Sequence, residues 1–203
     1  MSEVVSTEAL ITNEPRDTRA RLLAAAREEI KSEGILGLRV AEVAARAHYA
    51  VSVIYRHFGD RNGLVAEVLG DLYEETLSAR RERIAQLVPP TGPITIDHLV
   101  NLVPTPSEVA KSDELRIRLQ ILAVAATNPA LEKRVADIAQ KSYVEMLAFI
   151  TYLRSRLADG VDIDERVFTV MIVNQLLYYN TLLGEHSVDD DGYRQFIRDV
   201  LTR

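Results

Sequence analysis

The residue types that carry enzymatic chemistry are present in this chain, but not at catalytic spacings. Its 203 residues include no cysteine, which excludes disulfides, thiolate metal sites and cysteine nucleophiles. No two of the four histidines (His48, His57, His98 and His186) stand three or four residues apart, as metal-binding pairs on a helix do. The chain also has no glycine-rich phosphate loop and no serine nucleophile elbow. We therefore expect neither an enzyme nor a cofactor.

Two groups of aspartates have a composition that could hold a hard cation. They are Asp159, Asp162 and Asp164, and the run of residues 189–191. Neither group has the spacing of an EF-hand loop. Aspartate is also a preferred residue at the start of a helix. We interpret both groups as solvated helix boundaries and expect no metal site.

Residues 40–64 indicate a different chemistry, the recognition of DNA. Their sequence, VAEVAARAHYAVSVIYRHFGDRNGL, contains two short amphipathic segments separated by a break at residues 48–50. In the second segment, apolar residues recur at helical spacing, at Val51, Ile54, Tyr55 and Phe58. The other face carries Ser52, Val53, Arg56 and His57. A helix with an apolar underside and a polar, basic outer face predicts a helix-turn-helix whose second helix enters a DNA groove. A plain three-helix core is the alternative.

The charge distribution fits a basic module on an acidic body. The net charge of the chain is -6, yet residues 16–62 hold nine Lys/Arg and six Asp/Glu. The remaining residues hold 15 and 24. Because salt screens exposed charges beyond about 8–10 Å, a local basic patch is sufficient for phosphate contacts.

Two helices should support this motif. One is expected over residues 18–33, capped by Asp17 or Thr18, with Leu22, Ala26 and Ile30 at i+4 spacing. The other should begin after a cap at Asp60 and run to residue 87. We interpret the cluster of Arg80, Arg81 and Arg83 near its end as capping and solubility, not as a DNA contact.

The rest of the chain keeps a helical period. Helices are expected over residues 94–103, 107–126, 129–158, 165–183 and 190–202. The helix at 165–183 is apolar nearly all round, which favours one face in the core and another in a subunit interface; a central core helix is the alternative. The predicted fold class is all-α: an N-terminal three-helix helix-turn-helix DNA-binding domain, joined by a long helix to a second helical domain.

The expected organisation is a mobile N-terminal tail at residues 1–15, a DNA-binding domain at 16–62 and a helical domain at 63–203. The N-terminus lacks the charge and apolar core of a signal peptide. No apolar run approaches the roughly 20 residues that a membrane span needs. We therefore expect a cytoplasmic protein that does not bind membranes.

The span of residues 16–64 resembles the DNA-binding domain of TetR-type transcriptional regulators. The resemblance rests on residues 22–26, Gly34, residues 40–47, the Tyr-Arg-His-Phe run at 55–58, Gly59-Asp60-Arg61 and Leu64. It covers about a quarter of the chain. The resemblance implies that residues 63–203 form a helical ligand-binding (effector-binding) and dimerisation domain, which the helical remainder fits in outline.

The resemblance implies a cytoplasmic homodimer, paired through its C-terminal helices, that binds a palindromic operator in double-stranded DNA. The residues implied to face base edges are Val51, Ser52 and Val53. Those implied to lie near phosphates are Arg39, Tyr55, Arg56, His57 and Arg61. The sequence departs from the family pattern at the turn, where His48-Tyr49-Ala50 replaces the usual Gly-Val-Ser, and at Arg39 and Val53.

Candidate ligand contacts are aromatic and amide residues of the apolar body, although any one of them could simply fill the core. They are Tyr143, Phe149, Phe168, Met171, Asn174, Gln175 and Tyr178. This mixture suits a mostly apolar ligand with one or two polar groups. Gln175 and Tyr178 could equally belong to an interface.

We therefore interpret the chain as a ligand-responsive dimeric transcription regulator, a repressor released from its operator by a small, mostly apolar effector. The alternative is a TetR-like helical dimer that acts through ligand or protein binding and has weak or lost operator recognition.

Overall fold

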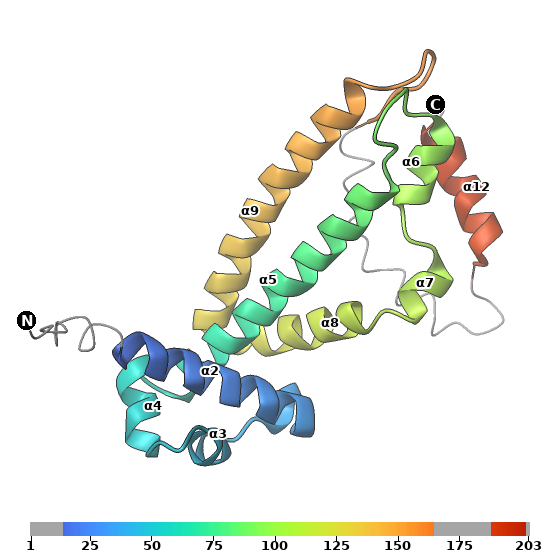
Figure 1. Cartoon of the computed structure of the whole chain (residues 1–203). Coiled ribbons are helices and arrows are strands. Elements are labelled where there is room, and N and C mark those ends of the chain that lie inside the picture. Colours follow the sequence, from blue (N-terminus) through green and yellow to red (C-terminus); the bar gives the residue numbers. More distant parts are fainter. Residues whose placement is uncertain (1–13, 165–187, 202–203) are drawn as a thin grey trace, which may run out of the picture. The chain divides into compact units, whose positions relative to one another are not determined.

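The computed structural model describes residues 14–164 and 188–201, and these are built from helices without a β-strand (Figure 1). A single isolated bridge joins Ile94 and Leu157. The described residues form two compact units. The first holds residues 14–72 together with Gln120–Val135, and the second holds Tyr73–Leu119 together with the described residues from Ala136 onward. The all-α prediction is confirmed. No helix within the described ranges is long and apolar enough to cross a membrane.

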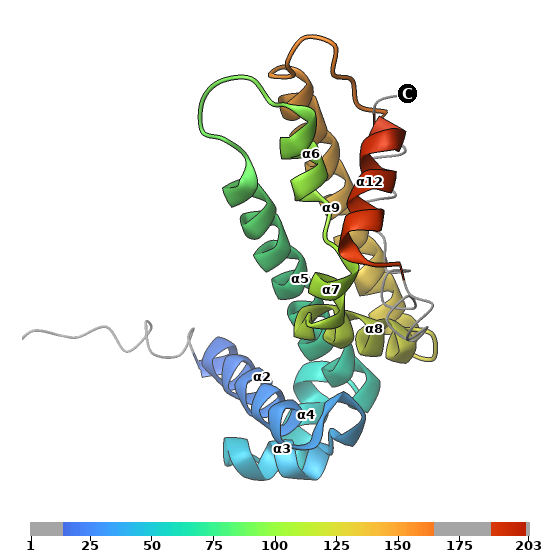
Figure 2. The same ribbon diagram turned by 90° about the vertical axis from the view of Figure 1, so that its right-hand side faces the viewer.

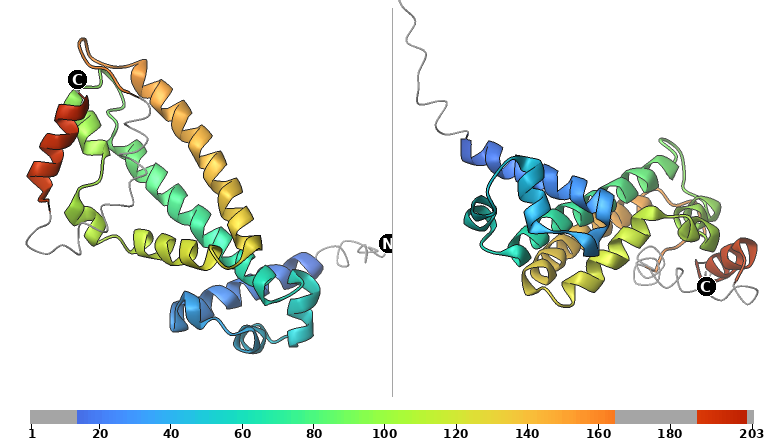
Figure 3. Two further views of the ribbon diagram at one scale, coloured as in Figure 1. Left: turned by 180° about the vertical axis from the view of Figure 1, so that it is seen from behind. Right: turned by 90° about the horizontal axis from the view of Figure 1, so that it is seen from below.

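The first unit begins with helix α2 (Glu14–Glu33), followed by the 3-10 turn η1 (Ile35–Gly37), α3 (Val40–Ala47) and α4 (Val51–Phe58). The helices α2, α3 and α4 cross one another (Figure 3). They pack because each buries one apolar side, with Leu22, Val43 and Ile54 fully buried. The start of α5 (Arg61–Leu87) completes this core with Leu64 and Val68.

The predicted bounds of the helices in the first unit are right for α3 and α4 and wrong for the start of α2. The ranges of α3 and α4 coincide with the predicted segments. Helix α2, in contrast, begins at Glu14, so the prediction of a start near residue 18 with Asp17 or Thr18 as cap was wrong. Pro15 lies in the first turn, where a missing amide hydrogen breaks no helical bond. Of the predicted tail, residues 1–13 lie outside the described residues.

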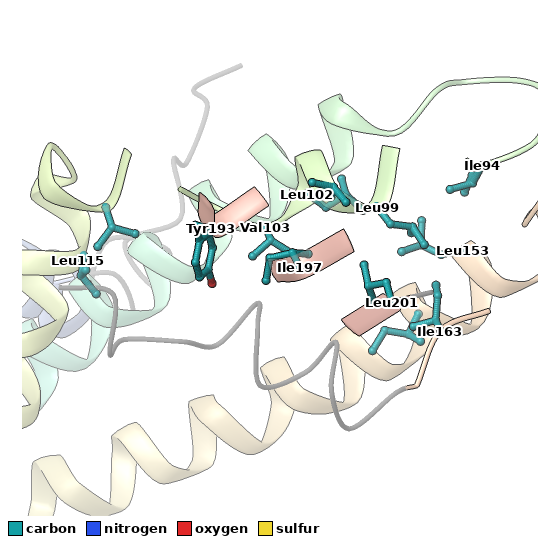
Figure 4. Close-up of a cluster of buried hydrophobic side chains, with 13 residues drawn as sticks. Ile94, Leu99, Leu102, Val103, Leu115, Leu153, Ile163, Tyr193, Ile197 and Leu201 are labelled. Carbon is teal, nitrogen blue, oxygen red and sulfur yellow. The ribbon is translucent and has the colours of Figure 1, made fainter. Parts of the chain in front are cut away.

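The second unit contains the rest of α5, α6 (Ile96–Leu102), α7 (Pro106–Ala110), α8 (Asp113–Ala125) up to Leu119, α9 (Pro129–Arg154) from Ala136, and α12 (Asp190–Leu201). Helices α6 and α12 lie side by side (Figure 2). Their buried faces form one apolar cluster, in which Val103, Ile197 and Leu201 lie together with Leu99 and Leu153 (Figure 4).

The predicted single helix at residues 107–126 is two helices. A turn at Lys111 and Ser112 separates α7 from α8. Capping groups explain the break. Thr105 and Glu108 form a capping box at the start of α7, and the Ser112 hydroxyl accepts a hydrogen bond from the Leu115 amide, 3.2 Å away. The helix predicted at residues 165–183 lies outside the described residues.

Candidate nucleic-acid interface

Helix α4 has one buried and one exposed face, as the sequence pattern predicts. Ile54 is fully buried beneath it, while Ser52 and Arg56 are exposed on the other side. Val51 and Val53 are half-buried. Tyr55 is 45% exposed, so the prediction that it joins the apolar underside was wrong, and its hydroxyl-bearing ring is available at the surface.

The turn before α4 is a Schellman motif with an unusual residue in its left-handed position. His48 has φ 60° and ψ 40°, and is the only non-glycine residue with positive φ in the described chain. The His48 amide donates to the Ala45 carbonyl at 3.1 Å, and the Tyr49 amide donates to the Ala44 carbonyl at 3.0 Å. Glycine adopts this conformation with less strain.

Helix α4 also begins without a side-chain cap. Ala50 has extended backbone angles, φ −75° and ψ 150°, and offers only its carbonyl, which accepts from the Val53 amide at 2.9 Å. Arg39, at the start of α3, likewise makes no side-chain cap. Both missing caps follow directly from the residue types.

Tyr49 links this turn to α2. Its hydroxyl accepts a hydrogen bond from Arg21 Nη1 at 3.3 Å and lies 3.4 Å from Thr18 Oγ1. The Arg21 guanidinium also lies 5.4 Å from the centre of the Tyr49 ring. Through these contacts the Tyr49 side chain attaches the turn to α2.

A buried carboxylate connects α2 to α3. Glu29 is 1% exposed, and its Oε2 accepts from Arg46 Nε at 3.0 Å. Its Oε1 lies 3.7 Å from Arg39 Nε but has no hydrogen-bond partner among the described residues. The exposed Arg39 side chain is therefore held beside the start of α3 by charge. The sequence analysis missed Glu29; its only signal was a carboxylate on the apolar stripe of α2.

The end of α4 and the start of α5 form a second fixed junction. Gly59 has φ 80° and ends α4, and Asp60 Oδ1 accepts the Gly63 amide at 2.7 Å, which confirms the predicted cap. A Cβ on Gly63 would lie 1.9 Å from the Phe58 carbonyl oxygen, so only glycine fits. Arg61 Nη2 donates to the Leu38 carbonyl at 3.3 Å. Arginine has five N–H donors, so others remain for a phosphate.

His57 differs from the other predicted DNA contacts. Its ring is half-buried beside Phe58, with ring centroids 6.4 Å apart. Its Nε2 atom is buried and has no hydrogen-bond partner among the described residues. Arg39, Arg56 and Arg61 are the exposed cations of the predicted set, and the structure brings them to one helix-turn-helix.

The predicted ligand residues fall partly on a cavity in the second unit. This cavity, of about 810 Å³, lies between α5 and α9 and includes Tyr143 and Phe149 in its wall. The other five predicted contacts, Phe168, Met171, Asn174, Gln175 and Tyr178, lie outside the described residues. Sequence reasoning missed the α5 side of the wall, namely Tyr73, Leu77 and Ile84, because an apolar stripe does not show whether it lines a cavity or a packed core.

Two short helices joined by a left-handed turn, with a buried underside and an exposed polar face on the second, define a helix-turn-helix protein. Residues 22–68 match the family of bacterial regulatory proteins, tetR family. The match covers the helix-turn-helix and the first turns of α5, so this part of the chain is similar to the DNA-binding region of tetR-family regulators. The expectation that the chain is not an enzyme agrees with this match to a family of regulatory proteins.

Two relatives and one solved structure illustrate the likeness. The transcriptional regulator CymR of Pseudomonas putida is 25% identical over 62% of this chain and 60% of its own length. The regulator BetI of Paraburkholderia phytofirmans is 36% identical over 35% of this chain and 37% of its own length. The matched regions thus span less than two thirds of either relative. A structure from Mesorhizobium loti assigned to the TetR family aligns over 92% of this chain and 94% of its own, with 15% identity and a TM-score of 0.60, a likeness of fold.

Proposed function

We propose that the chain is a homodimeric repressor that binds a palindromic operator in the cytoplasm and is released by a small, mostly apolar effector. Residues 16–62 act as the DNA-binding domain, and residues 63–203 bind the effector and pair the subunits. The observation that carries the proposal is the exposed polar face of α4, where Ser52 and Arg56 stand opposite the buried Ile54.

In this proposal the contacts divide by chemistry. Val51, Ser52 and Val53, at the N-terminal end of α4, meet base edges, where valine methyls suit thymine methyls and the serine hydroxyl suits either donor or acceptor. The other predicted residues, Arg39, Tyr55, Arg56, His57 and Arg61, meet phosphates. Arginine pairs with phosphate through two parallel N–H bonds, which fixes the register of the protein on the duplex.

The second unit supports effector binding and pairing. Its cavity of about 810 Å³ lies within the range of small-molecule sites, and its wall is mostly apolar. Tyr152 on α9 and Phe196 on α12 are 46% and 56% exposed, although both are large aromatic residues, and neither lines this cavity. Exposed apolar side chains are typical of a surface that another subunit covers. Analytical ultracentrifugation should therefore give a dimer.

Operator selection with the purified full-length protein tests DNA binding. We expect enrichment of a palindrome whose half-sites lie about one helical turn, or a multiple, apart. Arg56→Ala should weaken operator binding and reduce the slope of log K against log salt by about 1, because one phosphate contact is lost. Lys31→Ala is the matched control, since Lys31 already pairs with Glu28 on α2 and should leave binding unchanged. Unchanged operator affinity in both Arg56→Ala and Arg61→Ala would show that the reading face is misassigned.

One observation favours a second candidate function, a TetR-like helical dimer that acts through ligand or protein binding. Helix α4 begins at Ala50 without a side-chain cap, after a strained His48. If selection enriches no sequence even at low salt, while the protein remains a folded dimer, this candidate replaces the first.

A further inference from the structure

A second cavity of the second unit is lined by more cations than carboxylates, and one of the cations, Arg118, is buried. It has a volume of about 560 Å³ and lies beside α5, with α8 and the segment from α6 to α7 forming the rest of its wall. Arg80, Arg83 and Arg118 all line it. Sequence reasoning assigned Arg80 and Arg83 to capping and solubility, but they lie before the last turn of α5 and face this cavity.

Arg80 and Arg118 form no ion pair with a carboxylate among the described residues, although the Glu114 carboxylate attracts both electrostatically. Arg118 is 6% exposed, and its Nη1 donates a long hydrogen bond of 3.5 Å to the Thr76 carbonyl. Arg80 makes no hydrogen bond and no ion pair within the described part of the chain. Burial, followed by repulsion from Arg118 and Arg83, lowers the pKa of Arg80 to about 10, so it is still a cation at neutral pH. Burial likewise lowers the pKa of Arg118.

The acidic residues of the same wall are engaged elsewhere. Glu114 accepts from both terminal nitrogens of Arg83, one of them at 3.0 Å, and this bonding lowers the pKa of its carboxyl. Glu108 accepts the Thr105 amide at 2.8 Å within the capping box of α7. Asp113 pairs with Arg116. A buried cation without a partner is costly. The described residues therefore supply no ion-paired counter-anion to Arg80 or Arg118.

Arg80 also connects this cluster to the apolar cavity. Arg80 and Ile84 line both cavities, so Arg80 lies where the apolar cavity between α5 and α9 adjoins the arginine-lined cavity. On this basis we propose that Arg80 and Arg118 bind the oxyanion group of an amphipathic effector, a carboxylate or phosphate, whose apolar body occupies the cavity between α5 and α9. The inference rests on the proposed function, in that it names the chemical class of the effector.

Four ten-carbon probes test the charge preference: decanoate, decyl phosphate, decanol and decylammonium. Binding to the full-length protein without DNA is measured by titration calorimetry below the micelle concentration. We expect the two anions to bind at least tenfold more tightly than decanol, and decylammonium to bind least. The order of decanoate and decyl phosphate identifies which oxyanion the site prefers. Equal affinities for the anions and decanol would overturn the proposal.

Substitutions of single arginines test which side chain produces the preference for anions. Arg80→Met keeps the length of the side chain and removes its charge, so it should weaken anion binding about 10- to 100-fold while leaving decanol binding unchanged. The ligand-free variant should be as thermally stable as the parent or more so, because an unpaired buried charge is gone. Arg81→Met is the matched control: its charge is already paired with Glu145 at 3.1 Å, and anion preference should persist.

Two results separate this inference from the proposed function. Retention of the anion preference in Arg80→Met, with Arg118→Met also unchanged, would refute the oxyanion site. Operator selection on the same preparation reports independently on the regulator. A protein that selects an operator but does not distinguish decanoate from decanol retains the proposed function and loses only the effector class.

Discussion

Ala50→Ser should stabilise the protein by about 1 kcal/mol. The backbone at this position, with φ −75° and ψ 150°, already has the extended conformation of a helix N-cap. The side chain is exposed, so a hydroxyl replaces nothing that is packed. A serine Oγ there can accept an amide hydrogen from Ser52 or Val53 in the first turn, where the present alanine offers no acceptor. Measured gains for such caps lie between about 0.5 and 2 kcal/mol.

Urea denaturation followed by circular dichroism measures the change in free energy of unfolding. The matched control is Ala45→Ser, the same substitution at an exposed position inside α3, where serine lowers helix propensity and should destabilise by about 0.5 kcal/mol. The two variants should therefore differ in sign. If Ala50→Ser is neutral or destabilising while its m-value matches that of the parent, the first turn of α4 does not need a cap and the reasoning is refuted.

Two other substitutions test the backbone of the motif. His48→Gly should raise the free energy of unfolding by about 1 kcal/mol in the same assay, because glycine relieves the φ of 60°; a loss of stability would show that the imidazole makes a contact that outweighs the strain. Gly63→Ala should lower it by about 2 kcal/mol or more, although alanine favours helices by roughly 1 kcal/mol. The added Cβ would stand 1.9 Å from the Phe58 carbonyl oxygen, and a gain in stability would mean that this junction relaxes easily.

The helix-turn-helix could be predicted closely because local rules determine it. Helix α3 ends where His48 enters the left-handed region, and α4 ends at Gly59. The apolar period of each segment indicates where the helix lies before that end. The Asp60 cap is equally local, since the bond runs to an amide three residues ahead.

The features that could not be predicted depend on contacts between distant segments. Glu29 and Arg46 are 17 residues apart, and Arg83 and Glu114 are 31 apart. A periodic pattern identifies the face of a helix but not the partner across it. For the same reason, the sequence predicted Arg80 to be one of three surface cations. Most of the residues that share its cavity belong to α8 and to the segment before α8, which the pattern of α5 cannot indicate. The division of residues 107–126 was missed because Ser112 reads equally well as a helix residue or a cap.

The weak local signals around α4 imply that tertiary contacts fix its position. A helix of eight residues is too short to be stable alone in water, and this one lacks a side-chain cap. Three tertiary features hold the helix in place: the buried Ile54, the Arg19 guanidinium 5.2 Å from the centre of the Phe58 ring, and the attachment of Tyr49 to α2. None of these contacts involves Ala50. A cap at that position should therefore strengthen the helix without turning its exposed face, so Ala50→Ser should leave operator sequence preference unchanged while raising stability.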